Sequence, residues 1–406
     1  MSAPLLDLDL ASAAFKRDPH PTYARLRAET PVARVRMRGP VGRGATAFIV
    51  ARYADVSALL KDARLAKDPV SAGLSAPPAP PFLRPLFRNM LGLDDPDHAR
   101  LKRLVQATFT PRRIETMRAR TQAISARLLD AIDATQPFDL VARYALPLPV
   151  AVISDLLGVP AADQARFARW SGALIRAGHS SLGAALAMPE VIAFLAYVDH
   201  LIALKRRAPA DDLVSALIAA ADADDARLSG DELKAMIGIL LSAGHETTVN
   251  LIANGALALI DDAEAMASLR GSPAIMENAI EELLRFAGPV AMSTHRYARE
   301  DLAIAGIEIP RGAVVFGLIA SANRDADRFA APDRLDLART GNRHLTFGEG
   351  GHYCVGAALA RMEAAVAFAD LLQRFPTLML AEPRATVRAS GGMILSGLAR
   401  LRVRGV

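Results

Sequence analysis

Cysteine and aromatic residues are scarce in this 406-residue sequence, which has one cysteine, Cys354, and 5% Phe, Trp and Tyr. One cysteine excludes an intrachain disulfide and leaves too few thiolates for a ferredoxin-type iron–sulfur cluster or for most structural zinc sites. The 48 Lys and Arg residues give a formal net charge of +5 but are spread along the chain. Without aromatic neighbours they do not predict a surface on which nucleic-acid bases stack.

The sequence also lacks a Gly/Ser-rich linker, an internal repeat and an N-terminal signal peptide. Residues 1–10 carry Asp7 and Asp9 in place of a basic start and an apolar core, so we expect a cytoplasmic protein. Hydrophobic residues make up 52% of the chain and charged residues 22%, which allows a large buried core. Length alone would allow about two or three domains.

The longest apolar stretch, residues 235–260, could span a bilayer by length but is interrupted near its middle by His245, Glu246 and Asn250. Charge within the hydrocarbon of a membrane is costly. We therefore predict a long helix through the protein core and no membrane association.

Apolar residues recur at helical spacing over most of the chain. The predicted helices cover residues 19–30, 53–62, 97–109, 111–134, 161–177, 189–207, 211–223, 231–261, 273–287 and 355–375. Short strands are predicted over 32–37, 47–50, 302–304, 307–309 and 314–316, and within 386–403. Two stretches are predicted to be irregular: 68–85, which contains six prolines, and 178–188, which is rich in Ser, Gly and Ala. The pattern is that of a mainly α protein.

Cys354 lies in the run 347–356, Phe-Gly-Glu-Gly-Gly-His-Tyr-Cys-Val-Gly. We interpret it as a thiolate ligand of one metal, because Gly348, Gly350 and Gly351 can take the positive φ that aims backbone amides at a sulfur. The helix predicted after it adds the positive end of a helix dipole. The alternative is a small buried apolar side chain, the common fate of a free cysteine. A single thiolate suits an iron whose other ligands come from a macrocycle, which indicates haem.

The run resembles the haem-binding signature Phe-Gly-x-Gly-x-His-x-Cys-x-Gly of the cytochrome P450 family at every fixed position. The resemblance implies the mainly α cytochrome P450 fold, one large helical domain over residues 1–406 with small sheets enclosing a haem b. It implies Cys354 as the axial ligand of the haem iron, with Phe347 and Gly348 beside the cofactor. The activity that it implies is a haem-thiolate monooxygenase, inserting one oxygen atom from O2 into a hydrophobic small molecule by hydroxylation or epoxidation.

Residues 240–248, within the long apolar stretch, resemble the family's Ala-Gly-x-Asp/Glu-Thr element. The Thr247 hydroxyl can bond the Ala243 carbonyl four residues back, which predicts a local opening of the helix. Glu246 and Thr247 then form an acid–alcohol pair that delivers protons for O–O cleavage. The alternatives are a hydroxyl that only satisfies a carbonyl and a Glu246 that is an ion-pair partner. A zinc-protease motif starting at His245 fails, since Val249 stands where it needs a second histidine.

Glu282 and Arg285 lie three residues apart on one predicted helical face. Such pairs are common on solvated surfaces, but this one resembles the family's Glu-x-x-Arg element. By the same resemblance Arg334 supplies a second arginine. The three would form a buried ion network that supports the cysteine loop.

The resemblance also implies partners for the two haem propionates: His98, Lys102, Arg296 and His352. Lys102 departs from the usual arginine and cannot make its bidentate contact, so Arg100 or Arg103 is an alternative.

Carried over by position, the substrate pocket consists of small and aliphatic residues: Leu240, Ala243, Gly244 and Thr247, then Val290, Ala291 and Met292, then Met393 and Ile394. The two irregular stretches correspond to the lid over that pocket. A terpenoid, steroid, fatty acid or polyketide would suit it.

The chain ends at Val406, soon after the ligand helix, so we expect electrons from separate partners, a ferredoxin and its reductase, with the enzyme a monomer. Arg112, Arg113, Arg118 and Arg120 are candidate contacts for an acidic ferredoxin, or else a solvated helix face. A peroxygenase driven by hydrogen peroxide is a second hypothesis, against which the Glu246–Thr247 pair argues. A non-catalytic haem-binding or partner-activating protein is a third.

Overall fold

The computed structural model describes residues 3–10, 12–37, 45–75, 88–107, 109–167, 169–170, 181–222, 228–390 and 392–405. Its longer helices are α2 (His20–Glu29), α3 (Tyr53–Lys61), α5 (Asp97–Gln106), α6 (Pro111–Asp130), α7 (Pro147–Leu157), α9 (Ser181–Arg207), α10 (Leu213–Ala221), α11 (Gly230–Asp261), α12 (Ala263–Gly271), α13 (Met276–Phe286) and α15 (Ala357–Arg374). Shorter helical segments are α1 (Ala13–Arg17), η1 (Val70–Ala72), the π-helical η3 (Val141–Ala145), η4 (Ala161–Asp163), η5 (Pro273–Ile275), α14 (Ile319–Ala322), η6 (Gly350–His352) and η7 (Arg384–Thr386).

The strands are short and form four small sheets. The largest has the order β1-β2-β3-β9-β6-β4, built from β1 (Leu5–Leu6), β2 (Val32–Arg36), β3 (Thr46–Val50), β9 (Val314–Gly317), β6 (Arg296–Ala298) and β4 (Leu65–Ala66). A second has the order β10 (Leu378–Leu380), β13 (Arg402–Gly405), β5 (Phe138–Asp139). Two hairpin-like pairs complete the set: β7 (Leu302–Ile304) with β8 (Ile307–Ile309), and β11 (Ala389–Ser390) with β12 (Gly397–Leu398).

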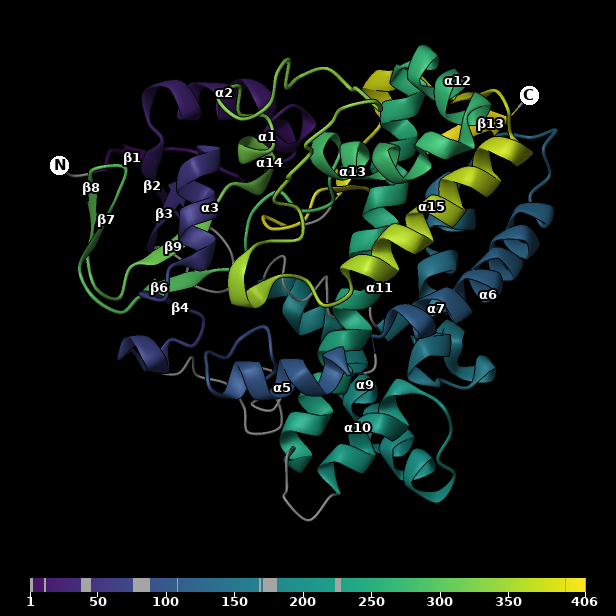
Figure 1. Cartoon of the computed structure of the whole chain (residues 1–406), viewed down its shortest axis with the longest axis horizontal. Helices are drawn as coiled ribbons and strands as arrows, with labels where there is room; N and C mark the ends of the chain where they lie inside the picture. Colours follow the sequence, from purple (N-terminus) through teal and green to yellow (C-terminus); the bar gives the residue numbers. More distant parts are fainter. Residues whose placement is uncertain are drawn as a thin grey trace.

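Helix α11 runs through the middle of the helical part, while the largest sheet lies on the other side of the molecule (Figure 1). Helix α11 begins with a capping box, in which Ser229 and Glu232 satisfy each other's backbone amides. Apolar side chains all round α11 are buried, from Leu233 to Leu259, because α7, α9, α13 and α15 pack on different sides of it. This buried helix therefore offers its middle to the interior of the protein.

The helices predicted from apolar spacing are confirmed in the main, with ends that differ by a few residues. In the segment 161–177 every described residue is helical, as η4 and then as α-helix over 164–167 and 169–170, while residues 168 and 171–177 lie outside those described. The prediction missed α7, whose apolar residues surround the helix and leave no polar face. It also missed β1, β4, β5, β6 and β10, which are two or three residues long and are defined by pairing with distant strands.

The irregular stretch predicted at 178–188 is wrong from residue 181 onward, because α9 begins there and includes Pro189. Residues 178–180 lie outside the described part. In the other predicted loop, 68–85, the described residues 68–75 hold only the single turn η1, and residues 76–85 are also outside.

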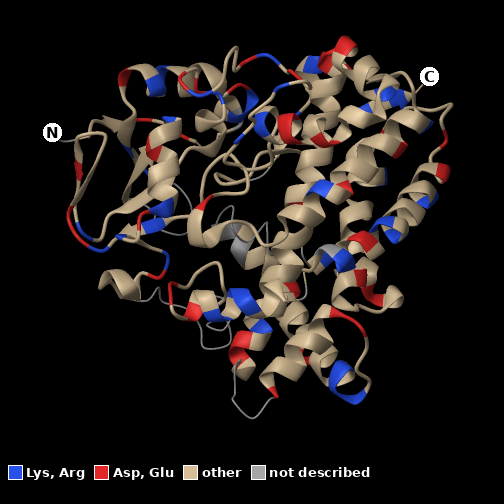
Figure 2. Cartoon of the chain, in the orientation of Figure 1, with Lys and Arg blue, Asp and Glu red and all other residues tan. Residues whose placement is uncertain are grey.

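By length and composition α9 could cross a membrane over residues 185–207, a test that core helices of soluble proteins also pass. In the structure α9 packs against α10 and α11. Figure 2 shows Lys and Arg interspersed with Asp and Glu over the helices, without one extended basic face in this view.

Candidate functional site

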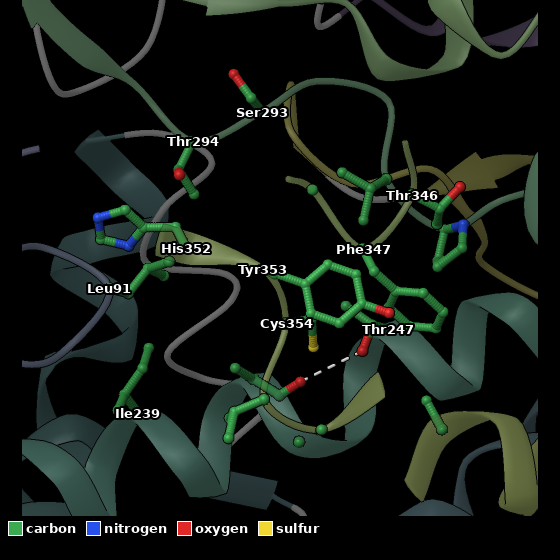
Figure 3. A pocket seen from close by; sticks show the side chains of 18 of the residues that line it. Leu91, Ile239, Thr247, Ser293, Thr294, Thr346, Phe347, His352, Tyr353 and Cys354 are labelled. Carbon is green, nitrogen blue, oxygen red and sulfur yellow. Dashed lines mark hydrogen bonds between the residues drawn. The ribbon is translucent and has the colours of Figure 1, made fainter. Parts of the chain in front are cut away.

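A cavity of about 480 Å³ lies between the middle of α11 and the segment 345–356 that leads into α15. Cys354, His352 and Phe347 line it from that segment, and Thr247 lines it from α11 (Figure 3). Further walls come from α5 and from the segments 289–296 and 394–395. The cavity therefore collects most of the residues that the sequence singled out.

The cysteine loop is held by its own backbone. Gly348 and Gly350 both have φ of 71°, the left-handed conformation for which glycine is suited. The Gly348 amide donates to the Leu345 carbonyl at 2.8 Å, and the Cys354 amide donates to the Phe347 carbonyl at 2.9 Å. The prediction for Gly351 is wrong: it lies in η6 without positive φ, against the His98 ring, which a Cβ there would approach to 3.6 Å.

The Cys354 side chain is exposed toward the cavity that it lines. Burial in the protein raises the pKa of this thiol, while the Gly356 amide and the charges of Lys102 and Arg361 act in the opposite direction. The amide aimed at the sulfur thus comes from Gly356, at the N-cap of α15, and not from the three glycines of the prediction. A bound metal cation would hold the sulfur as thiolate outright.

One edge of the cavity is lined by cationic and imidazole groups: His98, Lys102, Arg296 and His352. The rings of His98 and His352 lie with their centroids 3.9 Å apart. Burial, then the neighbouring charges of His98, Lys67 and Arg296, lower the pKa of His352 to about 2. The positive charge of this edge therefore comes from Lys102 and Arg296, while the lowered pKa keeps the His352 imidazole neutral.

Lys102, rather than Arg100 or Arg103, faces the cavity. Its ammonium donates to the Gly351 carbonyl at 2.5 Å and to the Tyr353 carbonyl at 3.0 Å. Arg100 instead binds Asp97 and Glu232, and Arg103 donates to the Ala99 carbonyl of its own helix. Neither alternative arginine lines the cavity.

On α11, the Thr247 hydroxyl donates to the Ala243 carbonyl at 3.3 Å, as predicted (dashed line in Figure 3). The predicted local opening is absent, because α11 continues as α-helix through this point. Gly244 allows α7 to approach, since a Cβ there would lie 2.7 Å from Ile153 Cδ1. Glu246 lines the cavity and forms no ion pair within the described residues, and burial raises its pKa to about 7.

Of the predicted pocket residues, Leu240, Ala243, Gly244, Val290, Met292 and Ile394 line the cavity. Ala291 and Met393 do not, and this part of the prediction is wrong. Both pack against the apolar cluster beneath β2, β3 and β9. Residues 291 and 393 both lie at bends of the chain, next to the bridge that pairs Val290 with Leu395.

The predicted ion network exists, with a different second arginine. The fully buried Arg285 binds the Glu282 carboxylate through two hydrogen bonds of 2.7 Å. Arg339 supplies the second guanidinium, whose Nε lies 3.1 Å from Glu282 Oε2. Arg334 was predicted for this place, but its side chain is exposed and only its carbonyl takes part, accepting from Arg285 at 3.1 Å.

Several cavity residues were missed from the sequence: Met90, Leu91, Phe109, Ile153, Ile239, Ser293, Thr294, Leu395 and Glu363. Glu363 follows Cys354 by nine positions on α15 and is fully buried. In the described part of the chain neither of its carboxyl oxygens has a hydrogen-bond partner, and burial raises its pKa well above the ordinary value. A lone acid in an apolar helix face is a signal that could have found it.

The comparisons with known proteins agree with this geometry. A family model, Cytochrome P450, matches residues 274–396. The chain is 41% identical over 405 residues to cytochrome P450 107B1 of Saccharopolyspora erythraea, covering 98% of each. It is 41% identical over 384 residues to mycinamicin IV hydroxylase/epoxidase of Micromonospora griseorubida, covering 94% of each. The solved structure of the tirandamycin C-bound P450 monooxygenase TamI matches with a TM-score of 0.90 at 41% identity, covering 99% of this chain and 100% of that one.

This chain therefore belongs to the cytochrome P450 family. It is a mainly α haem-dependent monooxygenase, which inserts an oxygen atom from O2 into a hydrophobic small molecule with electrons from redox partners.

Haem b, the cofactor of the family, fits the residues present. Its two carboxylate substituents match the cationic edge, where the buried Arg296 Nε has no acceptor among the described residues. Two other nitrogens of Arg296 donate to the carbonyls of Leu60 and Leu65. The thiol of Cys354 opens into the same cavity and is the one thiolate ligand that the chain can offer.

Proposed function

We propose that Cys354 is the axial ligand of the haem iron and that His98, Lys102, Arg296 and His352 hold the propionates. Phe347 and Gly348 belong to the same loop and would lie beside the haem, and the Arg361 guanidinium covers the Phe347 ring at 4.5 Å from its centroid. When bound, haem supplies the oxygen chemistry, and a thiolate ligand donates electron density that favours O–O cleavage. The single observation that carries this proposal is the one thiol opening into a cavity with a cationic edge.

We propose that Glu246 and Thr247 deliver protons inside the cavity. Burial raises the pKa of Glu246 to about 7, so at neutral pH this carboxyl group can both hold a proton and release it. Thr247 donates its own proton to the Ala243 carbonyl. Its oxygen lone pairs are therefore available to a water in the cavity, which they would orient.

Thr247→Ala tests this role. The variant should bind haem and substrate normally and oxidise NAD(P)H through its partners, because the hydroxyl is needed for neither. Product formed per NAD(P)H should fall about tenfold or more, with hydrogen peroxide rising in its place, since general acid–base groups contribute at least that much. Thr247→Ser keeps the hydroxyl and should restore most of the coupling. An unchanged ratio of product to NAD(P)H in Thr247→Ala would remove Thr247 from the mechanism.

For the substrate, we propose a bulky apolar natural product of the kind named for two relatives, mycinamicin IV and tirandamycin C. Support comes from the aliphatic walls of the cavity, among them Leu240, Met292 and Ile394. Mycinamicin IV, vitamin D3 and myristic acid can be titrated against the holoenzyme while the high-spin shift of the Soret band is followed. We expect the first to bind most tightly. Myristic acid binding best would contradict the proposal.

Two matched variants test whether that substrate binds in the cavity. Ile394→Ala should weaken binding about tenfold, the value of roughly one to two lost apolar contacts, because Ile394 faces inward. Met393→Ala should leave binding unchanged, because Met393 packs outside the cavity.

We further propose that residues 1–406 act as one domain, as a monomer in the cytoplasm, with a ferredoxin and a ferredoxin reductase as electron donors. Helix α6 packs on α15, the helix that starts beside Cys354. Three of its arginines already face carboxylates of the chain: Arg113 with Asp211, Arg118 with Glu115, and Arg120 with Asp155. The exposed Arg112 is thus the member of that group best placed to meet an acidic ferredoxin.

A further inference from the structure

Lys67 is a buried lysine that the sequence did not single out. It directly follows β4, and 3% of its surface is exposed. Its ammonium donates to the Thr294 hydroxyl and, at 3.0 Å, to the His295 carbonyl. Thr294 in turn lines the cavity (Figure 3), two residues before Arg296. Lys67 is therefore one hydrogen bond away from the cationic edge.

Among the described residues the charge of Lys67 is offset only in part, by the nearby carboxylate of Asp94. In the described part of the chain Lys67 forms no salt bridge. Asp94 accepts the backbone amides of Lys67 at 2.8 Å and of Asp68 at 3.1 Å, and pairs with Arg299 at 3.3 Å. A buried cation without a counter-ion is costly. Burial and then the charge of Arg296 lower the pKa of Lys67 to about 7. An anion in the cavity would lower the cost of burying the Lys67 charge and would offset the repulsion from Arg296.

The direction of the hydrogen bond adds a second, independent point. An ammonium group can only donate, so the Thr294 oxygen is the acceptor in its bond with Lys67. The one hydroxyl proton of Thr294 is then free to be donated to an acceptor in the cavity. Lys67 thus makes Thr294 a donor on the same edge as Arg296.

We propose that Lys67 and Thr294 belong to the haem site, Thr294 as a hydrogen-bond donor to a propionate and Lys67 as a positioning residue behind it. Lys67 orients the Thr294 hydroxyl and contributes buried positive charge, so that the propionates compensate two buried cations, Arg296 and Lys67. The inference rests on haem binding in this cavity, but not on the reaction.

The test uses Lys67→Met, which keeps the length of the side chain and removes its charge. Holoenzyme is mixed with excess apomyoglobin, and the rate of haem transfer is followed by absorbance. Transfer from Lys67→Met should be roughly tenfold faster than from wild type, the loss expected for one interaction with a charged group. Thr294→Val should show a smaller acceleration. Lys234→Met on α11, which removes a partly exposed lysine paired with Asp199, should match wild type.

Reconstitution with haem dimethyl ester distinguishes an interaction of Lys67 with the propionates from a purely structural role of Lys67. The ester has no carboxylate, so wild type and Lys67→Met should then lose the cofactor at equal rates. A variant that keeps natural haem as firmly as wild type, or that loses the ester faster, would overturn the proposal. Should Lys67→Met not fold, Thr294→Val decides by the same two measurements. The carbon-monoxide spectrum of each holoprotein reports thiolate ligation separately. A wrong assignment of the thiolate ligand can therefore be distinguished from a wrong assignment of Lys67 and Thr294.

Discussion

Two buried clusters of charged groups in this enzyme differ in how completely their polar atoms are paired. Around Glu282, two arginines, the Asn342 amide at 3.0 Å and the Asp336 backbone amide at 2.9 Å all donate to one carboxylate. Arg285 also donates to the carbonyls of Asn323 and Pro332. This cluster is closed around its charges: both Glu282 oxygens and all three Arg285 nitrogens have partners, and the Asn342 amide oxygen is the one atom of these side chains without a partner among the described residues.

The cluster around the cavity is open. Arg296 Nε and both Glu363 oxygens have no partner among the described residues, and Lys67 has no carboxylate partner there. Buried polar groups in proteins are otherwise almost always hydrogen-bonded. The difference indicates that the closed cluster stabilises the fold by itself, whereas the open one is completed by cofactor, substrate or water.

Arg285→Ala should break the closed cluster with the largest effect. It leaves the Glu282 carboxylate buried with part of its donors lost, which costs about 3–5 kcal/mol of unfolding free energy. We expect insoluble or haem-free protein, measured as the ratio of haem to polypeptide and by thermal unfolding of what remains soluble.

Arg334→Ala is the matched control for that variant. The Arg334 side chain is exposed and contributes only its backbone carbonyl, so the substitution should change stability by no more than about 0.5 kcal/mol. If Arg334→Ala were as damaging as Arg285→Ala, the assignment of Arg339 as the second arginine would be contradicted.

Glu363→Gln tests the open cluster around the cavity, and we expect a smaller effect on stability than from Arg285→Ala. Burial raises the folded pKa of Glu363 above its ordinary value of 4.5, so the folded state holds a proton that the unfolded state releases. The contribution of this acid is therefore fully present below the unfolded pKa and is lost as pH rises toward the folded pKa. Glu363→Gln, a neutral mimic, should gain stability relative to wild type as the pH rises above the ordinary value of 4.5.

The control for this pH dependence is Glu264→Gln, which removes an exposed carboxylate on α12. Its stability relative to wild type should not change with pH over the same range. Parallel stability curves for Glu363→Gln and wild type would mean that water or an ion keeps Glu363 ionised in the folded protein.

Local patterns could be predicted from the sequence because neighbouring residues determine them. The bond from Thr247 to Ala243 and the pair Glu282–Arg285 follow from helical spacing alone. The strands β7 and β8 were predicted to the residue, since two triplets with apolar ends flank the turn Ala305-Gly306, where both residues have positive φ.

Features that depend on distant contacts could not be predicted. Which arginine reaches Glu282 depends on how the segment 332–342 folds back over α13, so Arg334 was chosen in place of Arg339. The inward or outward direction of Ala291 and Met393 depends on the pairing of Val290 with Leu395. Lys67 had no local signal, because its partners Thr294 and His295 lie more than two hundred positions away.

The central claim is that the one cysteine binds the haem iron as thiolate, and the reduced carbon-monoxide complex tests it most directly. Freshly purified, reduced holoenzyme should absorb at about 450 nm under carbon monoxide, as the thiolate class does, and Cys354→Ala should lose that band whether or not it keeps haem. Folded wild-type protein absorbing at about 420 nm instead would indicate a neutral thiol or histidine ligand and would contradict the account.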